Sequence, residues 1–175
     1  MGKLINHTSL TVDGLTDVGS WYVAEGEHDR AGVARLAAAA ALLAGRRSYE
    51  GFAGYWPHQT GPWAEVLNPM PKYVASRTLR GPLEWNATLV EGDAVEGVAR
   101  LKAELDGDLF MSGCGELARI LIEHGLVDEL VFWVHPSIGG AGGRPYEEAA
   151  FGLRLLEATP FDSGVTLLRY EPAAG

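Results

Sequence analysis

The spacing of apolar residues divides the chain into alternating strand-like and helix-like segments. Residues 4–12 alternate loosely between apolar and polar side chains, which predicts a strand that ends at the turn Asp13-Gly14. Further strands are predicted over residues 72–76, 83–90, 109–111, 126–134, 153–158 and 165–170. The last two flank a turn at Asp162-Ser-Gly164. Strands that alternate with helices before a terminal hairpin favour a mixed sheet covered by helices on both faces.

The first predicted helix follows a loop over residues 16–27. Asp29 is placed to cap this helix, which runs through Leu36 towards the alanine run at residues 37–41. Alanine favours a helix by propensity. Residues 41–44 could instead form a short buried strand, because leucines lie between the alanines just before a glycine.

Capping residues and breaks mark the later helices. A second helix is expected to start within residues 48–52, and Asp93 is expected to cap a helix that continues to Leu105. Residues 54–71 contain four prolines and are predicted to be irregular.

Residues 111–117, Met-Ser-Gly-Cys-Gly-Glu-Leu, hold the most informative local pattern in the chain. They follow a short apolar run and open a helical pattern that continues to Ile122. Glycines let a ligand approach the backbone, and the N–H groups of the first helical turn face it, so such a turn can cradle a phosphate. A tight strand–helix turn without a ligand is the other interpretation, because two closely spaced glycines are a weak signal.

Bulk composition bounds the class of protein. The 175 residues, 47% of them hydrophobic and 21% charged, predict a single soluble domain over residues 1–175. A net charge of −9 argues against nucleic acid as a main partner, because phosphate backbones bind basic surfaces. The single Cys114 excludes an intramolecular disulfide, and neither a signal peptide nor a membrane span is evident, so a cytoplasmic protein is expected. The histidines and the cysteine show no metal-ligand spacing.

Three polar segments follow predicted strands and are expected to meet, because ligands of open α/β sheets bind beyond the carboxyl ends of the strands. Gly45-Arg-Arg-Ser-Tyr-Glu50 brings two arginines and a free hydroxyl to a helix start, which suits an anion. Ser76-Arg77-Thr78 suits a terminal phosphate monoester. Each segment alone could be a solvated polar turn. Together with the glycine loop they indicate a diphosphate and a separate phosphate, as in NADPH rather than NADH.

The order of these motifs resembles the dihydrofolate reductase-like superfamily. Within it, the chain is similar to stand-alone relatives of the C-terminal reductase domain of the riboflavin-biosynthesis deaminase/reductase. The matching motifs are Thr11-Val-Asp-Gly14, Gly45-Arg-Arg-Ser-Tyr-Glu50, Pro71-Lys-Tyr-Val-Ala-Ser-Arg-Thr-Leu79, Gly113-Cys-Gly-Glu-Leu117, Gly125-Leu-Val-Asp-Glu-Leu130 and Pro136-Ser-Ile-Gly-Gly-Ala-Gly142. The resemblance implies a three-layer αβα fold with a mixed, mostly parallel central sheet and a C-terminal antiparallel hairpin. It also implies NADPH binding, hydride transfer and, commonly, a homodimer.

The resemblance assigns three groups of positions to the cofactor. These are Gly45, Arg46 and Ser48 for its phosphates, Ser76 and Arg77 for the 2′-phosphate, and Gly113, Cys114 and Gly115 for the diphosphate. Two positions depart from the family pattern. Ser48 stands where threonine is usual and keeps the hydroxyl, and Cys114 stands where serine or another small residue is common.

The substrate side is less defined. The riboflavin enzyme has an Asp-Pro-x-Leu-x-Arg stretch where this chain has Gly51-Phe-Ala-Gly-Tyr-Trp-Pro57, which argues against a ribityl-phosphate substrate. Asp13 is the best candidate for a polar catalytic group, although the family often uses it to shape the turn. His135 could be a general acid or a hydrogen-bonded core residue. Planar substrates suit aromatic walls, for which the candidates are Trp21, Tyr22, Trp56 and Trp63, with core packing as their alternative role.

These features predict an NADPH-dependent oxidoreductase that transfers a hydride to the C=N or C=C bond of a small, planar, heterocyclic substrate. One alternative is a protein of the same fold that binds a nucleotide or another small ligand without turnover. Another is a dimeric scaffold with a vestigial pocket, against which the phosphate-binding residues argue. The lack of a recognisable proton donor keeps the binding protein open, and the fold alone does not decide between them.

Overall fold

An eight-stranded sheet organises the computed structural model, which describes residues 2–17, 19–147 and 149–173. Its strands are β1 (Leu4–Thr11), β2 (Ala41–Gly45), β3 (Lys72–Ala75), β4 (Ala87–Leu89), β5 (Leu109–Ser112), β6 (Glu129–His135), β7 (Leu153–Pro160) and β8 (Thr166–Pro172). They lie in the order β4-β3-β2-β5-β1-β6-β8-β7. Neighbours from β4 to β6 are parallel, whereas β8 is antiparallel to both β6 and β7. The predicted mixed, mostly parallel sheet with a C-terminal antiparallel pair is confirmed.

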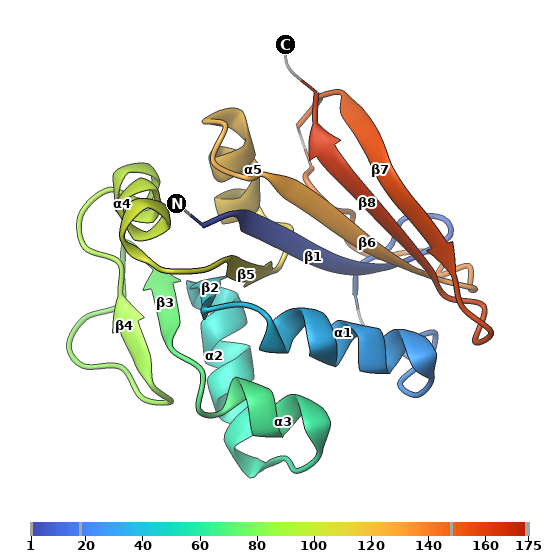
Figure 1. The fold of residues 1–175 in the computed structure, drawn as a ribbon, viewed down its shortest axis with the longest axis horizontal. Helices are drawn as coiled ribbons and strands as arrows, with labels where there is room; N and C mark the ends of the chain where they lie inside the picture. The colour runs from blue at the N-terminus through green and yellow to red at the C-terminus, as the bar shows by residue number, and fades with distance from the viewer. Residues whose placement is uncertain (1, 18, 148, 174–175) are drawn as a thin grey trace.

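Helices cover both faces of this sheet (Figure 1). One face carries α1 (Glu27–Ala37), α2 (Arg46–Tyr55) and α3 (Pro62–Leu67), with the short 3-10 helix η1 (Trp56–His58) after α2, and the other carries α4 (Ala94–Glu104) and α5 (Glu116–Glu123). Leu43 and Leu121 lie in the buried core beneath α4 and α5, and Leu36 and Leu42 lie in the core beneath α1. Each such side chain stabilises the fold by about 1.5–3 kcal/mol when fully buried. No helix in the described part of the chain is long and apolar enough to cross a membrane.

Two of the helix predictions are wrong. Helix α1 begins at Glu27 after Gly26, so Asp29 does not cap it; its Oδ1 instead accepts a hydrogen bond from Trp63 Nε1 (2.7 Å) and ties α1 to α3. Residues 54–71 are not irregular, because they hold the end of α2, then η1 and α3. Two of the four prolines, Pro57 and Pro62, lie in the first turn of η1 and of α3, where the missing N–H leaves no helical hydrogen bond unmade. Pro69 and Pro71 lie in the connection between α3 and β3.

The strand alternative for residues 41–44 is correct, and two other strands are shorter than predicted. Strand β4 begins only at Ala87, because Trp85 and Asn86 adopt positive φ angles of 60° and 52° that break the extended backbone. Strand β6 begins at Glu129 rather than at residue 126.

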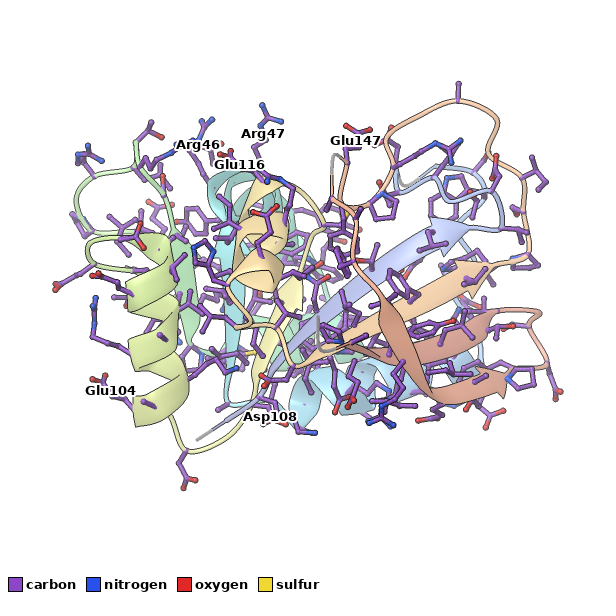
Figure 2. All side chains as sticks on the ribbon, turned by 90° about the horizontal axis from the view of Figure 1, so that it is seen from above. Arg46, Arg47, Glu104, Asp108, Glu116 and Glu147 are labelled. Atoms are coloured by element: carbon purple, nitrogen blue, oxygen red, sulfur yellow. The ribbon has the colours of Figure 1, made fainter. Side chains whose placement is uncertain are left out.

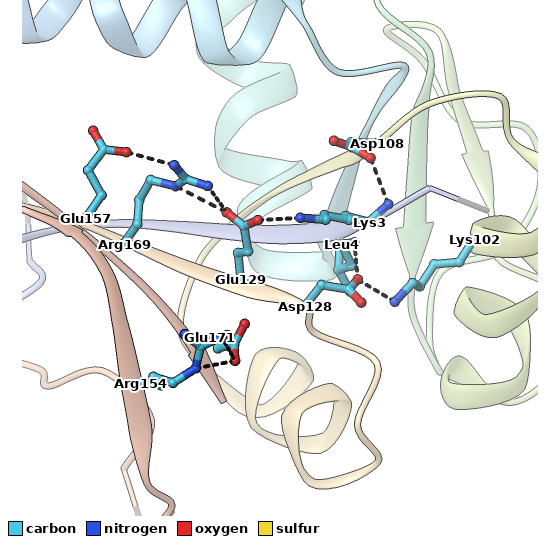
Figure 3. A network of polar contacts seen from close by, with 10 residues as sticks. All are labelled: Lys3, Leu4, Lys102, Asp108, Asp128, Glu129, Arg154, Glu157, Arg169 and Glu171. Atoms are coloured by element: carbon cyan, nitrogen blue, oxygen red, sulfur yellow. Dashed lines mark hydrogen bonds and ion pairs between the residues drawn. The ribbon is translucent and has the colours of Figure 1, made fainter. Parts of the chain in front are cut away.

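A charged network joins the N-terminal strand to the C-terminal strands (Figure 3). Glu129, only 4% exposed, accepts hydrogen bonds from Lys3 Nζ (2.7 Å) and Arg169 Nη2 (2.8 Å), and Arg169 also donates to Glu157 on β7 (2.7 Å). Burial alone would raise the pKa of Glu129, but the hydrogen bonds from Lys3 and Arg169 hold it below its ordinary value. The carboxylate therefore stays charged and links the start of β1 to β6, β8 and β7.

Asp93 caps α4 as predicted, since its Oδ1 accepts hydrogen bonds from Val95 N (2.9 Å) and Glu96 N (3.2 Å). Asp93→Ala removes both and is expected to lower the free energy of unfolding by about 1 kcal/mol in urea denaturation. Asp106→Ala is the matched control, because Asp106 is exposed and makes no hydrogen bond to the described residues. Equal stability of the two variants would contradict the capping contribution.

Candidate functional site

A cavity of about 610 Å³ lies at the carboxyl ends of β3, β2 and β5. These strands are neighbours in the sheet, so the loops that follow them meet, as the sequence predicts. The lining includes all but one of the predicted cofactor positions, namely Gly45, Arg46, Ser48, Ser76, Arg77, Gly113 and Gly115. Gly92 and Asp93, between β4 and α4, also line it.

Three helices begin at this cavity. The N-terminus of α4 is already satisfied, because the Asp93 carboxylate accepts its free N–H groups. The N-termini of α2 and α5 follow Gly45 and Gly115 and have no side-chain cap. Their free N–H groups and helix dipoles therefore favour an anion, and only these two of the three helix starts are open to one.

Arginines surround the same opening, and Figure 2 shows Arg46 and Arg47 beside Glu116 at one end of the molecule. The Arg77 guanidinium lies 3.2 Å from a Glu116 carboxylate oxygen, and Arg46 lies 3.6 Å from Glu50. Both pairs are exposed and contribute little free energy, so each arginine can exchange its carboxylate for a phosphate. Ser76 Oγ accepts hydrogen bonds from the backbone N–H groups of Thr78 and Leu79, and it also lies 3.5 Å from Thr78 Oγ1, where either hydroxyl can be the donor.

Gly113 brings two of these loops into contact. Its φ of 111° lies where only glycine is relaxed, and a Cβ added there would lie 3.0 Å from Ser48 Oγ. Gly45 and Gly115 meet no such close contact within the protein. A side chain at Gly113 would thus crowd the start of α2 as well as the cavity.

The Cys114 side chain does not line the cavity. It is half-buried against the core beneath α5, and burial raises the pKa of its thiol. Its carbonyl accepts a hydrogen bond from Tyr146 N (3.0 Å). Only the backbone of Cys114 is therefore available to a ligand in the cavity.

Asp13 binds the loop that follows β6. Its carboxylate accepts hydrogen bonds from Thr11 Oγ1 (2.6 Å), Gly139 N (2.9 Å) and Gly140 N (3.0 Å). These bonds, led by that from Thr11, lower the pKa of Asp13 to about 2, so it is charged at neutral pH. Its contacts are those of a loop anchor. A catalytic part for Asp13 stays a prediction, and it would act through charge rather than by donating a proton.

Residues 3–167 match the family model described as the RibD C-terminal domain. The chain belongs to this family. The match covers nearly the whole chain, including the cavity and both of its uncapped helix starts.

Individual proteins are similar to this chain in sequence or in fold. The uncharacterized protein YyaP of Bacillus subtilis is 28% identical over 136 residues, covering 74% of this chain and 72% of YyaP. A Shewanella sp. PV-4 protein named for riboflavin biosynthesis has a TM-score of 0.77 at 20% identity, covering 98% of this chain and 99% of that one. The Thermotoga maritima diaminohydroxyphosphoribosylaminopyrimidine deaminase/5-amino-6-(5-phosphoribosylamino)uracil reductase has a TM-score of 0.70 at 15% identity, and the match covers 98% of this chain but 57% of that protein. At these identities the solved structures show a shared fold.

In this RibD C-terminal domain, Trp21 and Tyr22 gather around His135 at the end of β6. Their ring centroids lie 5.2 Å and 4.7 Å from that of His135, and Val23 N donates a hydrogen bond to His135 Nδ1 (3.1 Å). His135 is 1% exposed, and its burial, together with the nearby His28, lowers its pKa to about 4. It is therefore neutral at pH 7, which favours the core role over that of a general acid.

Trp56 does not join this aromatic group. Its carbonyl accepts a hydrogen bond from Asn68 Nδ2 (3.2 Å), and the Asn68 carbonyl accepts one from Lys72 Nζ (3.1 Å) at the start of β3. Because β3 and β6 run in the same direction, the start of one and the end of the other lie at opposite edges of the sheet. The prediction that Trp56 shares a substrate wall with Trp21 and Tyr22 is wrong, and Trp56 packs against the core beneath the sheet.

Sequence reasoning missed two contributors to the site. Asp93 was expected only as a cap, although the glycine before it marks a loop that lines the cavity. Asn6 was not singled out, yet it is fully buried and its Nδ2 donates to the Gly113 carbonyl (2.7 Å). The sequence gives little signal for Asn6, because the first strand also holds the polar residues His7, Thr8, Ser9 and Thr11.

Two buried histidines make stability depend on pH. His7 is stacked on Phe110, with ring centroids 3.9 Å apart, and burial, with a smaller effect of Arg35, lowers its pKa to about 3. In the unfolded chain His7 and His135 bind protons near pH 6.5, but in the folded chain only near pH 3 and pH 4. The contribution of the two neutral histidines to the free energy of unfolding is therefore fully present above pH 6.5. It falls as the pH drops from 6.5 towards their pKa values in the folded chain.

Between pH 7.5 and pH 5 each of these histidines is expected to remove about 2 kcal/mol from the free energy of unfolding, measured by urea denaturation. Carboxylates with lowered pKa values, such as Asp13, contribute only at lower pH. His7→Phe should remove about half of the dependence, whereas the exposed control His58→Gln should leave it unchanged. Equal stability of the wild type at both pH values would refute the prediction.

Proposed function

We propose that this protein is a cytoplasmic, NADPH-dependent reductase of a small, planar, heterocyclic substrate with a C=N or C=C bond. The main support is the convergence of the uncapped N-termini of α2 and α5 with Arg46, Arg47 and Arg77 on one cavity. Membership in the RibD C-terminal domain family supports the reductase chemistry.

The donor groups in the cavity fit the phosphates of this cofactor. The N–H groups that begin α2 and α5, with the Ser48 hydroxyl, would hold the diphosphate, and Ser76 with Arg77 would hold the 2′-phosphate. Gly113 leaves room for a ligand to approach the backbone, since a side chain there would fill the space in front of Ser48. When bound, the reduced nicotinamide supplies the hydride, and the protein binds, orients and excludes water.

The segments on either side of Asp13 are held against the loop after β6, beside the ends of β1 and β6. Val12 N donates to the Ser137 carbonyl and Thr16 N to the Gly143 carbonyl, each at 2.9 Å. With the Asp13 carboxylate these bonds hold residues 12–17 against residues 137–143. A hydride acceptor next to this edge would be positioned mainly by shape and by Trp21 and Tyr22, which suits a planar ring.

Calorimetric titration with NADPH and with NADH tests the proposal, followed by a substrate screen that monitors the absorbance of the reduced nicotinamide. The screen begins with 5-amino-6-(5-phosphoribosylamino)uracil, pterins and flavin precursors. NADPH-selective binding with turnover supports the reductase. Selective binding without turnover of any heterocycle favours the ligand-binding alternative, and binding of neither nucleotide contradicts the proposal.

Arg77→Ala is expected to weaken NADPH far more than NADH, because only NADPH has the 2′-phosphate. The loss of a charged hydrogen bond, about 1.5–3 kcal/mol, corresponds to a roughly ten- to hundredfold higher Kd for NADPH. Arg30→Ala, on the exposed side of α1, is the control for net charge. Equal losses for the two nucleotides would remove Arg77 from the 2′-phosphate site.

We also propose that the chain forms a homodimer through the open sheet face at β7. Figure 2 shows α4 and α5 over the inner strands and no helix of the described chain over β7. Leu155 is 51% exposed, and exposed apolar side chains continue along the same segment at Phe151, Leu153 and Leu156. A row of exposed apolar side chains on an edge strand favours association, and the resemblance implies a homodimer.

The double variant Leu153→Lys/Leu155→Lys is expected to be monomeric in light scattering, because residues two apart on a strand share a face. Two buried lysines per protomer would prevent association without entering the core. Tyr55→Lys, at an exposed apolar residue at the end of α2, should leave the dimer intact. A double variant that remains dimeric would place the interface elsewhere.

A further inference from the structure

A buried carboxamide lies behind the glycine loop. Asn6, on β1, is fully buried, and both ends of its side chain are hydrogen-bonded. Its Nδ2 donates to the Gly113 carbonyl (2.7 Å), and its Oδ1 accepts a hydrogen bond from the Tyr146 hydroxyl. One side chain thus joins the central strand to the loop before α5 and to the segment that precedes β7.

The next carbonyl of the loop is held in the same way. Tyr146 N donates to the Cys114 carbonyl (3.0 Å), so the same tyrosine acts through its hydroxyl on Asn6 and through its backbone on Cys114. Burial raises the pKa of Tyr146, which keeps its hydroxyl protonated as a donor. Two successive carbonyls, of Gly113 and Cys114, are therefore occupied by partners within the protein.

Because the peptide group is planar, the direction of each carbonyl also fixes the direction of the N–H group that follows it. In a trans peptide the C=O and the following N–H point in opposite directions. Asn6 lies on β1, which is on the other side of β5 from β2 and the cavity. Carbonyls held towards Asn6 and Tyr146 leave the N–H groups of Cys114 and Gly115 directed away from them. Neither N–H has a hydrogen-bond acceptor among the described residues.

Contacts from other residues are needed to keep the N–H groups of Cys114 and Gly115 in this direction, because the glycines also permit the reversed peptide orientation. Gly113 has a φ of 111°, and the absence of a side chain on Gly113 and on Gly115 widens the range of backbone angles open to this loop. A rotated Gly113 peptide would present its carbonyl oxygen to an anion in place of the Cys114 N–H. Successive N–H groups that point the same way form an anion-binding concavity, and a single reversed carbonyl destroys it.

We infer that Asn6 and Tyr146 are positioning residues that hold the Gly113–Gly115 loop in its anion-binding orientation. The inference rests on the proposed function insofar as the anion is the diphosphate of a dinucleotide. Neither residue lines the cavity, so both act through the backbone that they orient. Because the diphosphate is common to NADPH and NADH, the two residues control affinity for both nucleotides and not the choice between them.

Tyr146→Phe tests this by removing only the hydroxyl. The Kd values of NADPH and NADH are expected to rise together by about fivefold, with their ratio unchanged, because one buried hydrogen bond that orients the loop is lost. Asn6→Asp should have a larger effect, since it places an acceptor oxygen against the Gly113 carbonyl. Tyr170→Phe is the control, because the rings of Tyr146 and Tyr170 both pack edge-on against Phe132, yet only Tyr146 holds Asn6.

Wild-type affinity in both Tyr146→Phe and Asn6→Asp would overturn the inference, as would a change in the NADPH-to-NADH ratio, which a merely oriented diphosphate cradle does not produce. If Asn6→Asp does not fold, Tyr146→Phe decides alone. Should the wild type bind neither nucleotide, the proposed function fails and inorganic pyrophosphate tests the cradle separately. Amide chemical shifts of Cys114 and Gly115 that respond to pyrophosphate in the wild type, and less in Tyr146→Phe, support the inference; no response in the wild type overturns it.

Discussion

The parallel pairing of β1 with both β5 and β6 is the constraint on which the rest of the structure depends. Parallel neighbours cannot be joined by a hairpin, so the chain must cross over through helices that begin at the carboxyl edge of the sheet. After β1 the chain turns towards β2, in the direction of β4, whereas after β5 it turns towards β6, in the direction of β7. The loops after β1 and β5 therefore diverge at the carboxyl edge of the sheet. Helix starts and polar loops thus gather at the carboxyl edge of the sheet, where the cavity beyond β3, β2 and β5 lies.

Local chemistry explains how much of the fold was predictable. Strands β2 and β5 are continuous apolar runs, as expected of strands buried on both faces, and Asp93 meets its partners within three residues. The prolines led to the wrong prediction that residues 54–71 are irregular. A proline that breaks a strand is acceptable in the first turn of a helix, as in α3. Asp29 was misassigned because its hydrogen-bond partner, Trp63, lies 34 residues away.

The candidate site also has features that the sequence predicts and features that it does not. The convergence of Gly45, Ser76 and Gly113 was predictable, since carboxyl ends of neighbouring parallel strands must meet. Trp56 was misplaced because an aromatic residue in a loop does not reveal at which edge of the sheet it lies. Asn6 was missed because the need for a buried amide arises only from Gly113, 107 residues along the chain.

Positioning, more than acid–base chemistry, is what this edge of the sheet provides. Asp13 stays ionised and anchors the loop after β6, and His135 is buried and neutral, so neither is a ready proton donor at neutral pH. The segment that Asp13 anchors continues to Tyr146, which orients the glycine loop through Asn6. The cavity proposed for the phosphates and the region proposed for the substrate are therefore linked by one stretch of backbone. Such a site favours hydride transfer, whose rate depends on the orientation of the reactants and the exclusion of water, over reactions that need a strong general acid.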